Sequence, residues 1–148
     1  MKTALQKLWV TLLAVVSLVA CGSPEPMTDD EATMWVAAYS PERIDMDATI
    51  RIEATDSLLA HIDTCRSLKS VFKFSPSIKG EARYAGGGRF IDFTPRKGSL
   101  KQGKQYNCRV RLSKLTGIDS LKDFSFDFVV HKRETRFDYV RVSVDPND

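Results

Sequence analysis

Apolar and polar residues alternate along much of the chain after residue 34, and this pattern predicts β-strands. Half-buried strands place successive side chains on opposite faces, so one residue in two is apolar. Residues 48–54 and 106–113 show this period, and residues 124–130 add a row of phenylalanines that marks a core strand. Shorter strands are expected at 34–39, 71–74, 81–84 and 89–93. The pattern therefore predicts seven strands.

Two connections complete the predicted fold. Residues 85–88 read Ala-Gly-Gly-Gly, which favours a tight hairpin because glycine tolerates positive φ. A phosphate-binding loop is not expected, since no Gly-Lys-Ser/Thr follows the run. Asp56 or Ser57 is expected to cap a short helix with an apolar side made of Leu58, Leu59, Ile62 and Cys65, crossing between two sheets. An all-β, immunoglobulin-like β-sandwich of about seven strands is predicted over 34–131, with a barrel as the alternative.

The first twenty residues have the layout of a secretory signal peptide. Lys2 and Lys7 precede an apolar run over 8–20 that ends in small residues. The run is too short to span a bilayer comfortably, because about 20 apolar residues are needed. Residues 1–20 are therefore predicted to be removed on export.

The end of this run resembles the lipobox of bacterial lipoproteins. It reads Leu18-Val19-Ala20-Cys21-Gly22, and in that family the signal is cut before the cysteine, whose thiol takes a diacylglycerol. Several acyl chains anchor a protein stably, whereas one chain binds only marginally. The alternatives are an ordinary signal peptide with a chance cysteine and a single-pass anchor. The resemblance implies a lipid-anchored protein of the bacterial cell envelope.

Residues 21–33 are predicted to be the lipidated cysteine and a flexible acidic tether. The stretch over 22–31 contains two prolines, four acids and no base, so it has little apolar area to bury. Gly22 after the cysteine resembles lipoproteins sent to an outer membrane. The acidic cluster over 29–31 is compatible with surface export, which leaves the periplasmic and the surface side both open.

Composition and charge indicate one globular domain and give no sign of a nucleic-acid partner. A chain of 148 residues with 43% hydrophobic and 28% charged residues suits one globular domain. The formal charge is +3, and two of the lysines precede Cys21 while no acid does, so the remainder carries +1. Nucleic-acid binding is not expected from such a balance.

The sequence offers no recognisable catalytic constellation. His61 and His131 lack the spacing of a metal-binding pair, and no frame for a nucleophilic serine or cysteine occurs. The carboxylates of Asp92, Asp119 and Asp127 are expected on outer faces or loops, as is that of Asp123. A protein without enzymatic activity, cofactor or metal is therefore predicted.

Cys65 and Cys108 remain as a pair once Cys21 is acylated. Both are predicted on apolar faces, which leaves two readings open. They form a disulfide in an oxidising compartment, or they are buried free thiols that act as small hydrophobic side chains. Free thiols are preferred.

Three segments resemble the immunoglobulin-like modules that open bacterial lipoprotein alpha-2-macroglobulins. They are 74–84 (Phe-Ser-Pro-Ser-Ile-Lys-Gly-Glu-Ala-Arg-Tyr), 90–95 (Phe-Ile-Asp-Phe-Thr-Pro) and 100–106 (Leu-Lys-Gln-Gly-Lys-Gln-Tyr). A closing strand of alternating phenylalanines follows, as in that family. Adhesins and surface-layer proteins carry similar motifs, and the lipobox favours the macroglobulins.

The resemblance implies an endopeptidase inhibitor that traps proteases in the envelope. The family's Cys-Leu-Glu-Gln thioester motif is absent from this chain, so this part is expected to supply anchoring and the first building block of the shell. Its implied partners are the membrane, trapped proteases and neighbouring macroglobulin modules. Residues 132–148 contain an alternating run over 137–144, which predicts a further strand or the start of a second module. The alternative is a stand-alone immunoglobulin-like surface lipoprotein that binds a protein or glycan.

Overall fold

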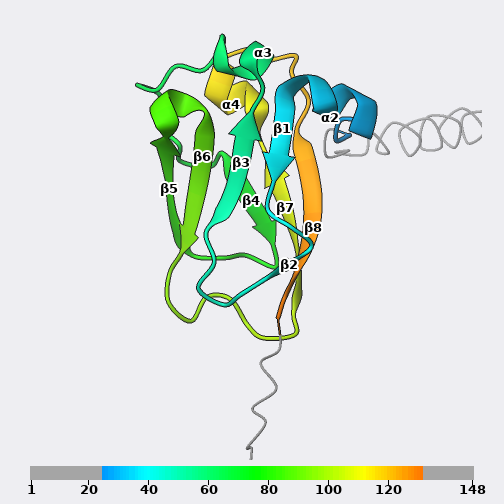
Figure 1. Cartoon of the computed structure of the whole chain (residues 1–148), viewed down its shortest axis with the longest axis vertical. Helices are drawn as coiled ribbons and strands as arrows, with labels where there is room; N and C mark the ends of the chain where they lie inside the picture. Colours follow the sequence, from blue (N-terminus) through cyan, green and yellow to red (C-terminus); the bar gives the residue numbers. More distant parts are fainter. Residues whose placement is uncertain (1–24, 132–148) are drawn as a thin grey trace, which may run out of the picture.

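Two four-stranded β-sheets form most of the structure, a computed structural model that describes residues 25–131 (Figure 1). The strands are β1 (Val36–Tyr39), β2 (Arg43–Ile44), β3 (Ile50–Ala54), β4 (Phe72–Ser75), β5 (Gly80–Ala85), β6 (Phe90–Pro95), β7 (Gln105–Val110) and β8 (Phe124–Val130). The helices are α2 (Asp29–Trp35), α3 (Asp56–Leu59) and α4 (Leu112–Thr116), with a 3₁₀ turn η1 (Gly86–Gly88). The predicted all-β class is confirmed.

The strand order is β1-β3-β6-β5 in the first sheet and β2-β8-β7-β4 in the second. All pairs are antiparallel except β2 and β8, which run parallel over two residues. Only the β5–β6 and β7–β8 connections stay within one sheet. The chain otherwise passes from sheet to sheet, which makes two packed layers.

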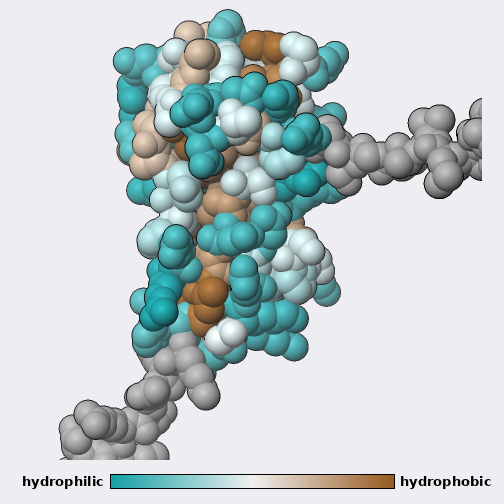
Figure 2. Space-filling model, turned by 90° about the vertical axis from the view of Figure 1, so that its right-hand side faces the viewer, coloured by the Kyte–Doolittle hydropathy of each residue, from teal (hydrophilic) through white to brown (hydrophobic). Residues whose placement is uncertain are grey.

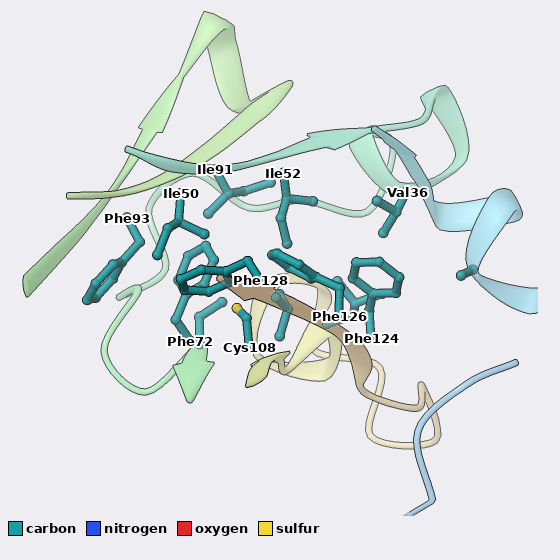
Figure 3. Close-up of a cluster of buried hydrophobic side chains, with 14 of the residues drawn as sticks. Val36, Ile50, Ile52, Phe72, Ile91, Phe93, Cys108, Phe124, Phe126 and Phe128 are labelled. Atoms are coloured by element: carbon teal, nitrogen blue, oxygen red, sulfur yellow. The ribbon is translucent and has the colours of Figure 1, made fainter. Parts of the chain in front are cut away.

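The core lies between the two sheets (Figure 3). Aliphatic and aromatic side chains of the first sheet point toward aromatic side chains of the second. The facing residues are Val36, Ile50, Ile52, Ile91 and Phe93 on one side, and Phe72, Cys108, Phe124, Phe126 and Phe128 on the other. On β8 the alternation is complete: the even-numbered residues over 124–130 are buried, and the odd-numbered ones are half-buried or exposed.

Each of the seven predicted strands is present, with ends that differ by a few residues. The eighth, β2, was not predicted, because two residues are too few to show a period. The predicted strand over 106–113 was too long, since β7 ends at Val110 and Leu112 begins α4. Leu112 and Leu115 are both buried on one side of that helix, and Gly117 ends it in the left-handed region at φ 78°.

The predicted tether over 21–33 was wrong for its last part. Residues Asp29–Trp35 form α2, and Met27 is only 8% exposed. Thr28 caps the helix in a capping box with Glu31, and three acids in the first turn complement the partial positive charge of the helix N-terminus. The acidic run that looked like a solvated tether is the first turn of a helix.

The two predicted connections are present. The helix between the sheets is the short α3, and Thr55 caps it instead of the expected Asp56 or Ser57. The glycine run forms η1 between β5 and β6, with Gly86, Gly87 and Gly88 all at positive φ. Glycine is needed there because other residues rarely adopt this conformation.

We predict that Phe128→Ala and Val129→Ala have very different effects on stability. Phe128 is 1% exposed within the core, whereas Val129, the next residue, is 36% exposed on the outer face. Losing the buried ring should lower the free energy of unfolding by about 3–5 kcal/mol, and the outer change by less than about 1 kcal/mol. Urea denaturation of both variants measures the difference. A larger loss for Val129→Ala than for Phe128→Ala would mean that β8 is shifted by one residue, which would exchange its two faces.

Candidate functional site

Cys21, the predicted lipidation site, lies outside the described residues. The structure does describe where the chain joins the module soon afterwards. The Met27 N–H donates to the Asp123 carbonyl oxygen at 2.9 Å, and the Lys122 ammonium donates to both oxygens of Glu31 at 2.9 and 3.0 Å. These bonds hold the first described residues, 25–31, against the segment that leads into β8.

The two histidines lie in different parts of the fold, His61 after α3 and His131 after β8. His61 is exposed beside Trp35, with ring centroids 6.1 Å apart, and His131 is exposed after β8. Within residues 25–131 no cluster of three or more histidine, cysteine or carboxylate side chains has metal-binding geometry.

Asp92 lies on an outer face, as expected, but its side chain is not exposed to solvent. It points to the outer face of the first sheet, yet it is 1% exposed because the Arg51 side chain covers it. Arg51 Nε and Nη2 donate to its two oxygens at 2.7 and 2.8 Å. The same guanidinium lies over the Phe90 ring at 4.8 Å. Asp123 is also buried, whereas Asp119 and Asp127 are exposed as expected.

The hydrogen bonds from Arg51 lower the pKa of Asp92 below its ordinary value of 3.8. The pair holds β3 to β6 across the outer face, where these two residues are register partners. Its arrangement is that of a structural ion pair, because the Arg51 side chain covers the carboxylate.

We predict that Asp92→Asn lowers the free energy of unfolding by about 2 kcal/mol at pH 7. Because the folded-state pKa is lowered, the contribution of the carboxylate is complete above the unfolded-state pKa of about 4 and is lost as pH falls through the folded value. Denaturation at several pH values should show the deficit narrowing below about pH 4. Asp127→Asn is the control and should change stability by less than about 0.5 kcal/mol. A pH-independent deficit would contradict this account.

Cys65 and Cys108 are both free thiols in the structure, and they occupy different environments. Cys108 is fully buried on β7, where burial raises the pKa of its thiol. Cys65 is exposed in the loop after α3, so the prediction that it lies on an apolar face was wrong. The helix ends at Leu59, which leaves Cys65 outside the periodic pattern.

We predict that a thiol-specific reagent labels Cys65 in the native Cys21→Ser chain and labels Cys108 only after denaturation. Thiolate is the reactive form, and burial suppresses both ionisation and access at Cys108. Mass spectrometry of labelled peptides measures each site, with Cys65→Ser as the control that removes native labelling. If denatured, unreduced protein took up no label, the two cysteines would form a disulfide.

The surface hollows in the described part of the chain include three that could receive a ligand. One of about 610 Å³ lies beside β4 and β5, with Leu68 and Phe72 in its lining, and one of about 440 Å³ lies beside α4. The third, which we term the β8 groove, has a volume of about 380 Å³. It is lined by Tyr39, Glu42, Gln105, Ser125, Phe126, Asp127, Phe128 and Val129. None of the three brings together a nucleophile, a base and an orienting group.

No protein-family model and no curated protein matches this chain. The helices in the described part are all too short or too polar to cross a membrane. The described residues therefore provide surface hollows and an N-terminal segment that hydrogen bonds hold to the module. They provide no constellation for catalysis.

Proposed function

We propose that this chain is the lipid-anchored N-terminal module of an alpha-2-macroglobulin-like endopeptidase inhibitor of the bacterial envelope. The module is an immunoglobulin-like sandwich that anchors the inhibitor and begins its shell. Its partners are the membrane, through the acyl chains on Cys21, the following macroglobulin modules, and the proteases that the complete protein traps.

The order of the strands supports the immunoglobulin-like identity. Constant-type immunoglobulin domains place strands A, B, E and D in one sheet and C, F and G in the other. Lettering β1 and β3–β8 from A to G gives the orders A-B-E-D and G-F-C. The remaining strand, β2, lies beside β8 as a second part of the first strand. A barrel is not supported, because β4 and β5, the neighbouring edge strands of the two sheets, are not paired with each other.

The observation that carries the proposal is the corner formed by the Leu-x-x-Gly-x-x-Tyr motif. Tyr106 is buried at the start of β7, and its hydroxyl accepts a hydrogen bond from the Lys101 N–H at 3.2 Å. Gly103 turns the chain at φ 70°, and Leu100 is buried beneath it. A tyrosine that bonds back to the backbone a few residues upstream is a mark of immunoglobulin-type sandwiches.

The other motif positions also coincide with structural boundaries. β4 ends at Ser75, directly before Pro76, and β6 ends at Pro95, which closes the Phe-Thr-Pro run. Phe93 of that run is buried in the core. The resemblance therefore rests on residues that each have a physical role in this fold.

The short distance along the chain between Cys21 and Met27 supports the anchoring role. Five residues separate them, and a fully extended chain spans at most about 3.6 Å per residue, so Met27 stays within about 22 Å of the lipid. Met27 is fixed to the module by its hydrogen bond to Asp123. A lipid on Cys21 would hold this side of the sandwich close to the bilayer.

We predict that the product made in its native envelope begins at Cys21, carries acyl chains, and belongs to a chain many times heavier than 148 residues. Globomycin, which blocks the lipoprotein signal peptidase, should prevent this processing. Intact-mass measurement with and without the drug tests both parts of the proposal, and Cys21→Ser is the matched control that should lose the acyl mass.

An acylated product no larger than this chain predicts would instead establish the stand-alone binding lipoprotein. The exposed Tyr39 ring in the lining of the β8 groove favours that second function. An unacylated product would contradict the anchor and both functions with it.

A further inference from the structure

The chain leaves the first sheet at the end of β1 and joins the second sheet at β2. The part of β8 that precedes β2 is left without a strand beside it among the described residues. β1 pairs with β3 as far as Tyr39, and Ser40 then ends the pairing: its N–H donates to the Arg51 carbonyl at 2.9 Å, while its hydroxyl accepts from the Arg51 N–H at 2.8 Å. Pro41 has no N–H to donate. The chain crosses to β8 only at β2, where two residues pair.

The backbone groups of Ser125 and Asp127 point to this uncovered edge. On β8 the N–H of Val129 donates to the Glu42 carbonyl and that of His131 to the Ile44 carbonyl, so odd-numbered residues face the β2 side. The N–H of Val130 donates to Lys104 on the β7 side, as the alternation of an antiparallel pair requires. Among the described residues, no backbone hydrogen bond to Ser125 or Asp127 crosses this edge.

The uncovered edge forms the β8 groove, and its walls are apolar as well as polar. Tyr39 is 53% exposed, although its ring packs against Phe124 and Phe126 at centroid distances of 5.1 and 4.9 Å. Val129 is also exposed at the other end of the groove. Figure 2 shows this side of the molecule, where an apolar strip runs between hydrophilic flanks.

The charge of the groove selects one kind of occupant. Glu42 and Asp127 line it, no basic side chain does, and neither carboxylate forms an ion pair with another described residue. Asp127 accepts one hydrogen bond, from the neutral Asn107 amide at 2.8 Å. Cationic side chains on an incoming segment would meet these two carboxylates, and apolar ones would meet Tyr39 and Val129.

We propose that the β8 groove binds an extended peptide segment of a partner protein, in which Lys or Arg alternates with β-branched residues. The segment adds to the second sheet beside Ser125 and Asp127, whose four backbone groups supply hydrogen bonds. Exposed sheet edges bind extended peptides in this way, with the main chain giving affinity and the side chains giving selectivity. The inference goes beyond the anchoring role, because it concerns an interaction surface that either proposed function can use.

The test uses the full chain in neutral detergent micelles and the acetylated probe peptide Lys-Val-Arg-Val-Lys-Val. We expect the amides of Ser125 and Asp127 to exchange with solvent at least tenfold more slowly when the peptide is bound, as measured by NMR. Two N-methylated versions of the peptide, blocked at alternate residues, distinguish main-chain pairing from charge alone. One should lose at least tenfold in affinity and the other should bind as the parent does.

Charge-reversed variants test the selectivity. Glu42→Lys combined with Asp127→Lys should weaken binding of the basic peptide at least tenfold and favour the acidic counterpart Glu-Val-Glu-Val-Glu-Val. Glu81→Lys combined with Asp119→Lys makes the same change in net charge away from the groove and should leave binding unchanged. Circular dichroism melts check that each variant is folded.

Four outcomes would overturn the proposal. Equal weakening by both double variants, or equal binding of the two methylated peptides, would mean non-specific electrostatic attraction. Slow exchange at Ser125 and Asp127 without peptide, lost on deletion of residues 132–148, would assign the groove to the chain's own C-terminal segment. Protection that rises with protein concentration would assign it to a second copy.

Discussion

The row of phenylalanines on β8 is the constraint on which the rest of the fold depends. Phe124, Phe126 and Phe128 point into the space between the sheets. The side chains that face them from the first sheet are mostly the smaller, branched valine and isoleucine. The Phe128 ring stacks near Tyr106 at a centroid distance of 5.6 Å and meets Phe74 edge-on at 6.4 Å. Because successive strand residues face opposite ways, this row fixes the register of β8 and leaves its odd-numbered residues outside.

The same register links the core to the surface. Burying even-numbered side chains also directs the even-numbered N–H groups toward β7, so the odd-numbered N–H groups face the outer edge. Tyr106 packs on Phe128, and its hydroxyl accepts a hydrogen bond from the Lys101 N–H. This bond fixes the turn that leads into β7. The core packing and the direction of the edge N–H groups are therefore two consequences of one alternation, and the early end of β1 leaves those edge groups uncovered.

Period-two alternation predicted the strands because it is a local signal that burial imposes on every half-buried strand. It could not predict β2, whose two residues hold no period, and it overran the end of β7 because Leu112 continues the alternation into a helix. The helix α2 has a capping-box signal in the sequence, but the acidic, proline-containing composition of the segment favoured a tether. Thr28 and Glu31 have capping-box spacing, and the acids between and around them suit a helix start as well as they suit a tether.

The candidate surface was harder to predict than the fold, since exposure depends on what a neighbouring strand places above a residue. Asp92 occupies an outward position, and it is buried only because Arg51 stands opposite it on β3. The reverse holds at Tyr39, the last residue of the strand predicted over 34–39, whose ring is exposed although it packs against Phe124 and Phe126. The ring is exposed because β1 ends at that residue and the chain pairs with β8 only from Arg43 onward. Both outcomes follow from pairings between distant segments, which alternation along a single strand does not encode.

The early end of β1 is therefore more than a local irregularity. A β-sandwich gains two short first strands when its leading segment passes from one sheet to the other, and each then covers only part of an edge. Proteins commonly protect such edges with charge, and Glu42 and Asp127 provide it here. Two carboxylates repel acidic segments and other copies of the same acidic edge, while they leave main-chain donors and acceptors available to a basic strand. The same two carboxylates therefore protect the edge against unspecific strand pairing and make it selective for basic segments.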